Sequence, residues 1–138
     1  MGAMPAATKP GERYETRAPS RRVLLVEDDP DALETLRSWA ETQDCEIRTA
    51  RSGEAALQIG ASFEPHVLIT DYLLRDELTG VDVIAELRRR GVKVSCVLVT
   101  AVMHKALLES LHRIDGVPIL AKPFDFGRLA ELVTRGGR

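Results

Sequence analysis

The chain has 138 residues, 44% of them hydrophobic, which fits one compact domain and leaves little material for a second core. The 19 Lys and Arg residues against 21 Asp and Glu residues give a formal charge of −2, which offers no positive field for nucleic acid or an anionic membrane. The two cysteines are too few for a disulfide framework or a metal knuckle, and no apolar segment reaches the roughly 20 residues of a membrane span. We therefore expect a cytoplasmic protein with reduced thiols.

The first 20 residues differ in composition from the rest of the chain. They lack the apolar core of a signal peptide and are rich in Ala, Pro, Gly and charged residues. We interpret residues 1–20 as a disordered arm and residues 21–135 as a single domain.

Five short aliphatic runs alternate with segments of helical spacing. The runs predict strands at 22–26, 46–50, 66–70, 94–100 and 117–121. The helices are predicted from apolar residues three or four positions apart: Leu33, Leu36, Trp39 and Ala40; Ala56, Ile59 and Phe63; Val83, Ile84 and Leu87; Met103, Leu107, Leu111 and Ile114; and Phe126, Leu129 and Val133. This alternation is typical of an α/β protein, a doubly wound parallel sheet with helices on both faces.

Local signals at the segment ends agree with this fold. The first, third and fourth runs are almost continuously apolar, as in central strands, whereas Glu46–Arg48 alternates like an edge strand. Asp29, followed by proline, predicts the start of the first helix, and Ser52 predicts the start of the second. The run Arg88–Arg90 before Gly91 predicts the end of the third helix. These cations could also form a nucleic-acid patch, but their attraction to a helix C-terminus is the reading we favour.

Polar residues stand where the predicted strands end. Glu27 and Asp28 follow the first strand, Asp71 follows the third, Thr100 ends the fourth, and Lys122 follows the fifth. In an open doubly wound sheet, ligands bind beyond the carboxyl ends of the strands, where the strand order reverses. We therefore expect these five side chains to gather at one edge.

Three carboxylates and one ammonium at one edge favour phosphoryl chemistry on a metal. Like charges about 4 Å apart repel by about 4 kcal/mol at an effective dielectric constant of 20, so clustered acids need a cation. Mg²⁺ meets that need, since it prefers carboxylate and phosphate oxygens. Asp71, on a central strand, is the candidate nucleophile for an aspartyl-phosphate. Lys122 would pair with the incoming charge, and Thr100 would hydrogen-bond a phosphoryl oxygen.

Each of these residues also has an ordinary interpretation when taken alone. An Asp after a strand commonly starts a turn, which is the more frequent role for a residue placed like Asp71. Glu27 and Asp28 would be favoured at a helix entrance by the macrodipole. Thr100 alone resembles a turn cap, and Lys122 alone a surface lysine before proline. Their joint occurrence at the ends of one sheet favours the functional reading.

The segments "VLLVEDD", "VLITDYLL", "VLVTA" and "ILAKPF", in this order and spacing, resemble the receiver domain of two-component response regulators over about residues 21–135. The resemblance implies a flavodoxin-like sheet of five parallel strands in the order 2-1-3-4-5 with five helices. It implies that a histidine kinase or phosphotransfer protein phosphorylates Asp71 in a Mg²⁺-dependent step. Asp28, Asp71 and the backbone carbonyl of Leu73 would bind the metal, and Glu27 would act mainly through water. A cis peptide between Lys122 and its proline is also implied.

The sequence departs from the family pattern in three ways. Ile119 stands where family members commonly carry a Phe or Tyr that turns inward on phosphorylation. The loop from Asp71 to Gly80 is one residue longer than the commonest pattern and lacks the usual proline after Leu74. Leu73 and Val102, two residues after the acceptor and the hydroxyl, are both apolar, which bears on water access and phosphoryl lifetime.

The remaining candidates have structural interpretations. His66, His104 and His112 lack ligand spacing, the first at the start of a strand and the others on a helix, and we assign them structural or surface roles. Cys96 is predicted as a small core residue and Trp39 as a packing residue.

The leading hypothesis is therefore a phosphoacceptor switch that is not a turnover enzyme. A receiver-like scaffold that ignores phosphorylation is the alternative, motivated by Ile119. A small phosphatase or mononucleotide-binding protein is less favoured, because acids occupy the first turn where phosphate binding needs glycines. Since the chain ends after the fifth helix, we expect a stand-alone regulator or a receiver cut from a larger protein such as a hybrid kinase. The output partner and the oligomeric state stay open.

Overall fold

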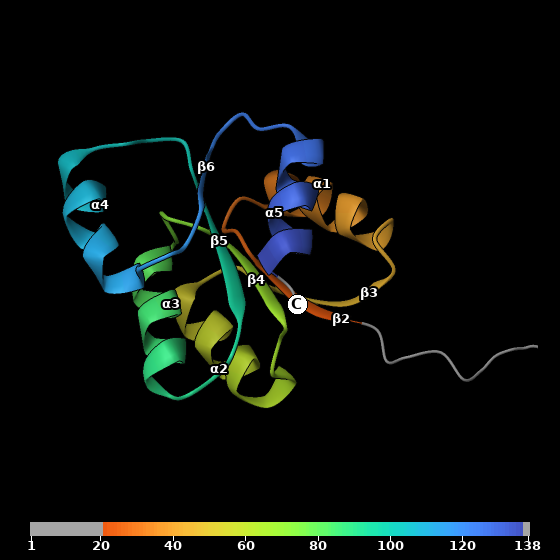
Figure 1. The fold of residues 1–138 in the computed structure, drawn as a ribbon, viewed down its shortest axis with the longest axis horizontal. Helices are drawn as coiled ribbons and strands as arrows, with labels where there is room; N and C mark the ends of the chain where they lie inside the picture. The colour runs from red at the N-terminus through yellow and green to blue at the C-terminus, as the bar shows by residue number, and fades with distance from the viewer. Residues whose placement is uncertain (1–20, 137–138) are drawn as a thin grey trace, which may run out of the picture.

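The computed structural model describes residues 21–136, which form a parallel sheet between two layers of helices (Figure 1). The arm predicted at 1–20 lies outside the described residues. The strands are β2 (Arg21–Val26), β3 (Cys45–Ala50), β4 (Val67–Asp71), β5 (Ser95–Thr100) and β6 (Ile119–Ala121). The helices are α1 (Pro30–Glu41), α2 (Gly53–Phe63), α3 (Gly80–Arg89), α4 (Lys105–Ser110), the 3₁₀ helix η2 (Leu111–Ile114) and α5 (Phe126–Gly136).

The strand order of the sheet is β3-β2-β4-β5-β6, and every pairing is parallel. Counted along the chain this is the predicted order 2-1-3-4-5, so the expected doubly wound fold is confirmed. Val26 lies opposite Ala50 on one side and Thr70 on the other, and Asp71 lies opposite Val99. The carboxyl ends of the strands therefore share one edge. The strand order reverses between the neighbouring strands β2 and β4.

Both faces of the sheet are covered because successive strand side chains point in opposite directions. Leu24 and Val26 of β2 belong to the apolar cluster that includes α2, α3 and α4. Val23 and Leu25 belong to the cluster that includes α1 and α5. Figure 1 shows α1 and α5 on one side of the sheet and α2 and α3 on the other. No helix within residues 21–136 has the length and apolar character required to span a membrane.

The predicted helix ends are confirmed. The Asp29 carboxylate accepts a hydrogen bond from the Ala32 N–H at 2.9 Å and caps α1. Ser52 caps α2, and Gly91 follows α3 with a φ of +82°, in the left-handed region that glycine adopts without strain. The arginines at the end of α3 are exposed, and Arg90 pairs with Glu86 at 2.8 Å. These contacts agree with the helix-end interpretation of the arginine run.

The prediction of the fourth helix was partly wrong. Met103 does not lie on an inward helical stripe, because it precedes the helix and is 53% exposed. The structure places His104 at the N-cap rather than inside the helix, with Nδ1 accepting from the Leu107 N–H at 3.1 Å. A side chain that satisfies an orphan N–H sets the start of a helix, which apolar spacing alone does not reveal. The last strand also starts later than predicted, at Ile119.

The structure confirms the structural roles predicted for three residues. Cys96 is buried within β5, and Trp39 stacks on Phe126 with ring centroids 5.5 Å apart. His66 Nδ1 accepts the Arg22 N–H at 2.9 Å and so joins two strand starts.

Gly80, at the start of α3, lies against the backbone of the strand that carries Asp71. A Cβ atom at this position would stand 2.3 Å from the Asp71 carbonyl oxygen and 2.8 Å from Leu98 Cδ1. The helix therefore starts close to β4 only because the side chain is absent, and the Gly80 N–H donates to the Tyr72 carbonyl at 2.8 Å.

We expect Gly80→Ala to lower the free energy of unfolding by about 2 kcal/mol, since the backbone beside it has no room to yield. Gly127→Ala is the control, because its nearest contact, at 3.0 Å, is the movable carboxylate of Asp125. Urea unfolding measures both variants. Equal stability of Gly80→Ala and wild type would contradict the close packing.

Candidate functional site

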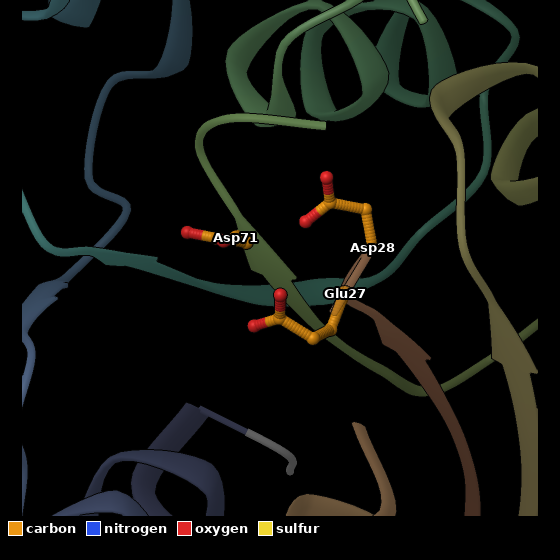
Figure 2. A group of neighbouring side chains, drawn as sticks. All are labelled: Glu27, Asp28 and Asp71. Carbon is orange, nitrogen blue, oxygen red and sulfur yellow. The ribbon is translucent and has the colours of Figure 1, made fainter. Parts of the chain in front are cut away.

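Three carboxylates meet beyond the ends of β2 and β4. Glu27 directly follows β2, is 4% exposed, and is held by its N–H, which donates to the Ala50 carbonyl at 3.0 Å. Asp71 is the last residue of β4, with a side chain 12% exposed. Oxygens of Glu27, Asp28 and Asp71 lie within 4.8 Å of one another (Figure 2). The cluster therefore lies at the reversal of the strand order.

Lys122 supplies the positive charge of this cluster. Its Nζ lies 2.8 Å from Glu27 Oε1 and 3.2 Å from Asp71 Oδ2. It comes from the turn after β6, where the Lys122–Pro123 peptide is cis, as predicted. Burial alone would lower the pKa of the ammonium, but the hydrogen bond to Glu27 and the charge of Asp71 raise it above its usual value. One ammonium thus contacts two of the three acids.

The protonation of Asp71 is shifted by this crowding. Burial raises the pKa of the carboxyl group, the charge of Glu27 raises it further, and Lys122 only partly opposes both, so the pKa rises from 3.8 to about 6. The Tyr72 N–H donates to Asp71 Oδ1 at 2.9 Å and fixes the orientation of the carboxylate. The Asp71 carboxyl group is thus ionised mainly at neutral pH and above, and its charge is poorly compensated.

The donor set fits a hard divalent cation. All three side chains offer carboxylate oxygens at mutual distances that one ion could bridge. Glu27 and Asp71 share Lys122, whereas the Asp28 carboxylate receives no hydrogen bond from any residue within 21–136. Asp28 is therefore the acid left for a ligand, and oxygen-only chemistry suits Mg²⁺ rather than a soft metal.

Thr100 and Leu73, which the sequence also predicted for this site, have other contacts. The Thr100 hydroxyl donates to the Val102 carbonyl at 2.7 Å and accepts the Val102 N–H at 3.1 Å, which closes the turn after β5. Leu73 forms an isolated antiparallel bridge with Thr79, and its side chain is 52% exposed. The structure thus brings together Glu27, Asp28, Asp71 and Lys122, and it does not join the Thr100 hydroxyl to them.

Two residues that the sequence analysis missed contact the loops of the cluster. The Arg51 guanidinium donates to the Asp28 carbonyl from Nε at 3.3 Å and from Nη2 at 3.1 Å. Asp76 accepts the Gly53 and Glu54 N–H groups, at 3.0 and 2.9 Å. Both residues act through partners more than 20 positions away in sequence, so local spacing carries no signal for either contact.

A cleft of about 520 Å³ opens beside the acids, between α1 and the turn that leads into α5. Glu27, Asp71 and Lys122 form its polar end, and its walls are mostly apolar. The walls are Val26, Ala32, Thr35, Leu36, Ile69, Val99, Ala101, Pro123, Phe124 and Phe126. The Asp71 carboxylate therefore lies at the polar end of an open cleft.

Comparison with known proteins agrees with this geometry. Residues 23–134 match the sequence profile of the response regulator receiver domain. The chain belongs to the receiver domain family. Receiver domains of response regulators are signalling domains, and the resemblance inferred from the four sequence motifs is confirmed.

Two individual relatives show the extent of the similarity. It is 28% identical over 121 residues to the probable C4-dicarboxylate response regulator DctR of Halalkalibacterium halodurans, covering 86% of this chain and 52% of that protein. It is 26% identical over 114 residues to the regulatory protein AtoC of Escherichia coli, covering 83% and 24%. The chain thus spans about half or less of the length of these relatives.

A solved structure supports the fold alone. The signal receiver domain of an HD domain-containing protein from Pseudomonas fluorescens Pf-5 superposes with a TM-score of 0.78 at 21% identity. The match covers 85% of this chain and 94% of that one.

The shifted pKa of Asp71 predicts a pH-dependent effect of Asp71→Asn in metal-free protein. Because the folded-state pKa is about 6 against 3.8 for the free group, stability falls as pH rises between these values, and above 6 the folded protein bears the full cost of the ionised group. Asp71→Asn should therefore raise the stability at about pH 8, by on the order of 1–2 kcal/mol, and change it little at about pH 3.5, below both pKa values. Thermal unfolding with a chelator measures this difference. The exposed Asp115→Asn is the control, and an equal gain for Asp71→Asn at both pH values would contradict the prediction.

Proposed function

We propose that residues 21–135 form a phosphoacceptor receiver domain of a two-component phosphorelay. A partner histidine kinase or phosphotransfer protein would phosphorylate Asp71, with Mg²⁺, and the modified domain would change its binding to another protein. The observation that carries the proposal is the gathering of Glu27, Asp28, Asp71 and Lys122 where the strand order reverses. It is supported by family membership over residues 23–134.

The proposed metal site uses groups already close together. Asp28, Asp71 and the backbone carbonyl of Leu73 would hold Mg²⁺, and Glu27 would act mainly through water. When bound, Mg²⁺ would neutralise charge between the acceptor and an incoming phosphoryl group. The unpartnered Asp28 carboxylate and the poorly compensated Asp71 support this assignment.

In the proposed step, a carboxylate oxygen of Asp71 attacks the phosphorus of a phosphohistidine. The new P–O bond forms as the P–N bond breaks, and the departing imidazole nitrogen keeps the electron pair and takes a proton from solvent. The Lys122 ammonium would pair with the negative charge of the transferred phosphoryl group. Thr100 would leave its Val102 turn to donate to a phosphoryl oxygen.

The same geometry disfavours a phosphatase. The ammonium beside Asp71 has a raised pKa, so Lys122 would stay protonated at neutral pH and give up its proton poorly as an acid catalyst. Glu27, the other neighbour, is engaged with Lys122 and with the Asp29 N–H at 3.1 Å. We therefore propose that the domain stores a phosphoryl group and does not turn over phosphoesters.

The switching part of the proposal is supported by a contact from Tyr72 to α4. Tyr72 directly follows Asp71, is buried, and packs its ring edge-on against His104 with centroids 5.5 Å apart. His104 caps the six-residue α4. Ile119, where an aromatic switch is common in the family, is half-buried and aliphatic. We propose that changes at Asp71 reach α4 through Tyr72 and His104; the scaffold alternative holds if α4 does not respond.

We also propose protein partners and a cytoplasmic location. The formal charge of −2 gives no attraction to nucleic acid. Cys45 and Cys96 are free thiols, as is usual in a reducing compartment.

Incubation with acetyl phosphate and Mg²⁺ should add one phosphoryl group to the wild-type chain. Intact mass measures the adduct, which Asp71→Asn should abolish and a chelator should prevent. Asp115→Asn, which keeps every acid of the cluster, should react like wild type. An equal adduct in Asp71→Asn, or none in wild type, would remove the proposal.

Beryllofluoride with Mg²⁺, a phosphoryl mimic, should shift the amide NMR signals of Lys105–Ser110 in wild type. In Tyr72→Leu, signals beside Asp71 should still shift, and those of α4 should shift by less than about half as much, because the ring contact is lost. His104→Asn should behave like Tyr72→Leu, since Asn retains the cap and lacks the ring. Undiminished α4 shifts in both variants would exclude this route, and no α4 shift in wild type would favour the scaffold.

A further inference from the structure

The start of α2 touches both loops of the proposed metal site. Arg51, just before α2, donates two hydrogen bonds to the carbonyl of Asp28, at 3.3 and 3.1 Å. The Gly53 and Glu54 N–H groups donate to the two carboxylate oxygens of Asp76, at 3.0 and 2.9 Å. The loop after β2 and the loop after β4 thus meet at one short segment.

The contact of Asp76 with the helix is additional to the helix's own cap. The Ser52 hydroxyl accepts the Ala55 N–H at 3.1 Å, which leaves the N–H groups of Gly53 and Glu54 without a partner inside the helix. Asp76 takes both. Burial disfavours its charge, but the backbone N–H groups of Glu54, Gly53, Asp76 itself and Leu78 together outweigh that effect and lower the pKa of the carboxyl group. Asp76 therefore stays ionised and bound to the helix at neutral pH.

Packing holds the same loop against the helix. A Cβ atom on Gly53 would lie 2.5 Å from Leu78 Cβ and 3.2 Å from Asp76 Oδ1. Glycine thus allows the loop to lie directly on the first turn of α2. This contact and the two hydrogen bonds fix the middle of the loop from Asp71 to Gly80, which is longer than the common family pattern and lacks its proline.

The contacts that hold this loop lie around Leu73, whose backbone carbonyl is the proposed metal ligand. Leu73 is bridged to Thr79, and the Tyr72 carbonyl accepts the Gly80 N–H at 2.8 Å. Asp76 holds the part of the loop between these contacts. Movement at Asp76 would therefore reach Leu73 through a short, tethered backbone.

We infer that Arg51 and Asp76 are positioning residues for the metal and that they act through one shared support, the start of α2. This inference rests on the proposed function, since it concerns the same Mg²⁺ site. Arg51 holds the backbone of Asp28, and Asp76 holds the loop of Leu73. Groups that orient metal ligands without touching the metal change affinity by about 10- to 100-fold when removed.

Isothermal titration of the full chain with MgCl₂ tests the inference. Arg51→Ala and Asp76→Ala should each weaken Mg²⁺ binding by about 10-fold. Asp76→Asn, which keeps an acceptor oxygen, should recover part of the loss. Because the two residues share one support, the double variant should lose clearly less than the roughly 100-fold product of independent effects.

Ser52→Ala is the matched control for helix stability. It removes the helix's own cap and touches neither loop, so it should lower the melting temperature by about 3 °C, as Asp76→Ala should, with Mg²⁺ affinity within about twofold of wild type. The inference would be overturned if Ser52→Ala lost as much Mg²⁺ affinity as Asp76→Ala, because helix stability alone would then explain the effect. It would also be overturned if Asp76→Ala kept wild-type affinity, or if the double variant lost the full product of the two single effects. If wild type bound no Mg²⁺, or Asp28→Asn bound it equally, the proposed metal site itself would fail.

Discussion

The site depends on acids that are crowded together against one ammonium. Glu27 and Asp71 both contact Lys122, and Asp28 stands within 4.8 Å of them without a donor among the described residues. The folded chain tolerates this because each acid is attached to a strand whose position is fixed by parallel pairing on both sides. Residual negative charge, rather than the shape of the cleft, is what would make this edge receptive to a cation.

The rest of the fold keeps these charges in place. Apolar residues fill both faces of the sheet, so the strands that carry the acids cannot move independently. Gly80 lets α3 start against the Asp71 carbonyl, and the Tyr72 N–H orients the Asp71 carboxylate. Stability thus comes from the layers of helices, and the destabilising crowding is confined to the edge that carries the proposed site.

Two sides of the site have different structural connections. Toward α2, Arg51 and Asp76 link both acidic loops to one helix start, which would favour rigid positions for the proposed metal ligands. Toward α4, Tyr72 contacts His104 at the start of a helix of only six residues. A short helix held by one imidazole cap is more easily displaced than the long helices that cover the sheet. Rigidity on one side and a weak element on the other are what the proposed switch would require.

The strand order 2-1-3-4-5 was implied by the resemblance to the receiver family, whereas the sequence pattern alone determined the layers and the meeting of Glu27, Asp28, Asp71 and Lys122. These follow from rules that act locally or by topology, because apolar periodicity sets the elements and the carboxyl ends of parallel strands share one edge. Only the tertiary structure decided that His104 caps α4, that the Thr100 hydroxyl bonds Val102, and that Asp76 binds the start of α2. Those outcomes depend on where loops pack, and hydrogen bonds between loops distant in sequence leave no periodic pattern to detect.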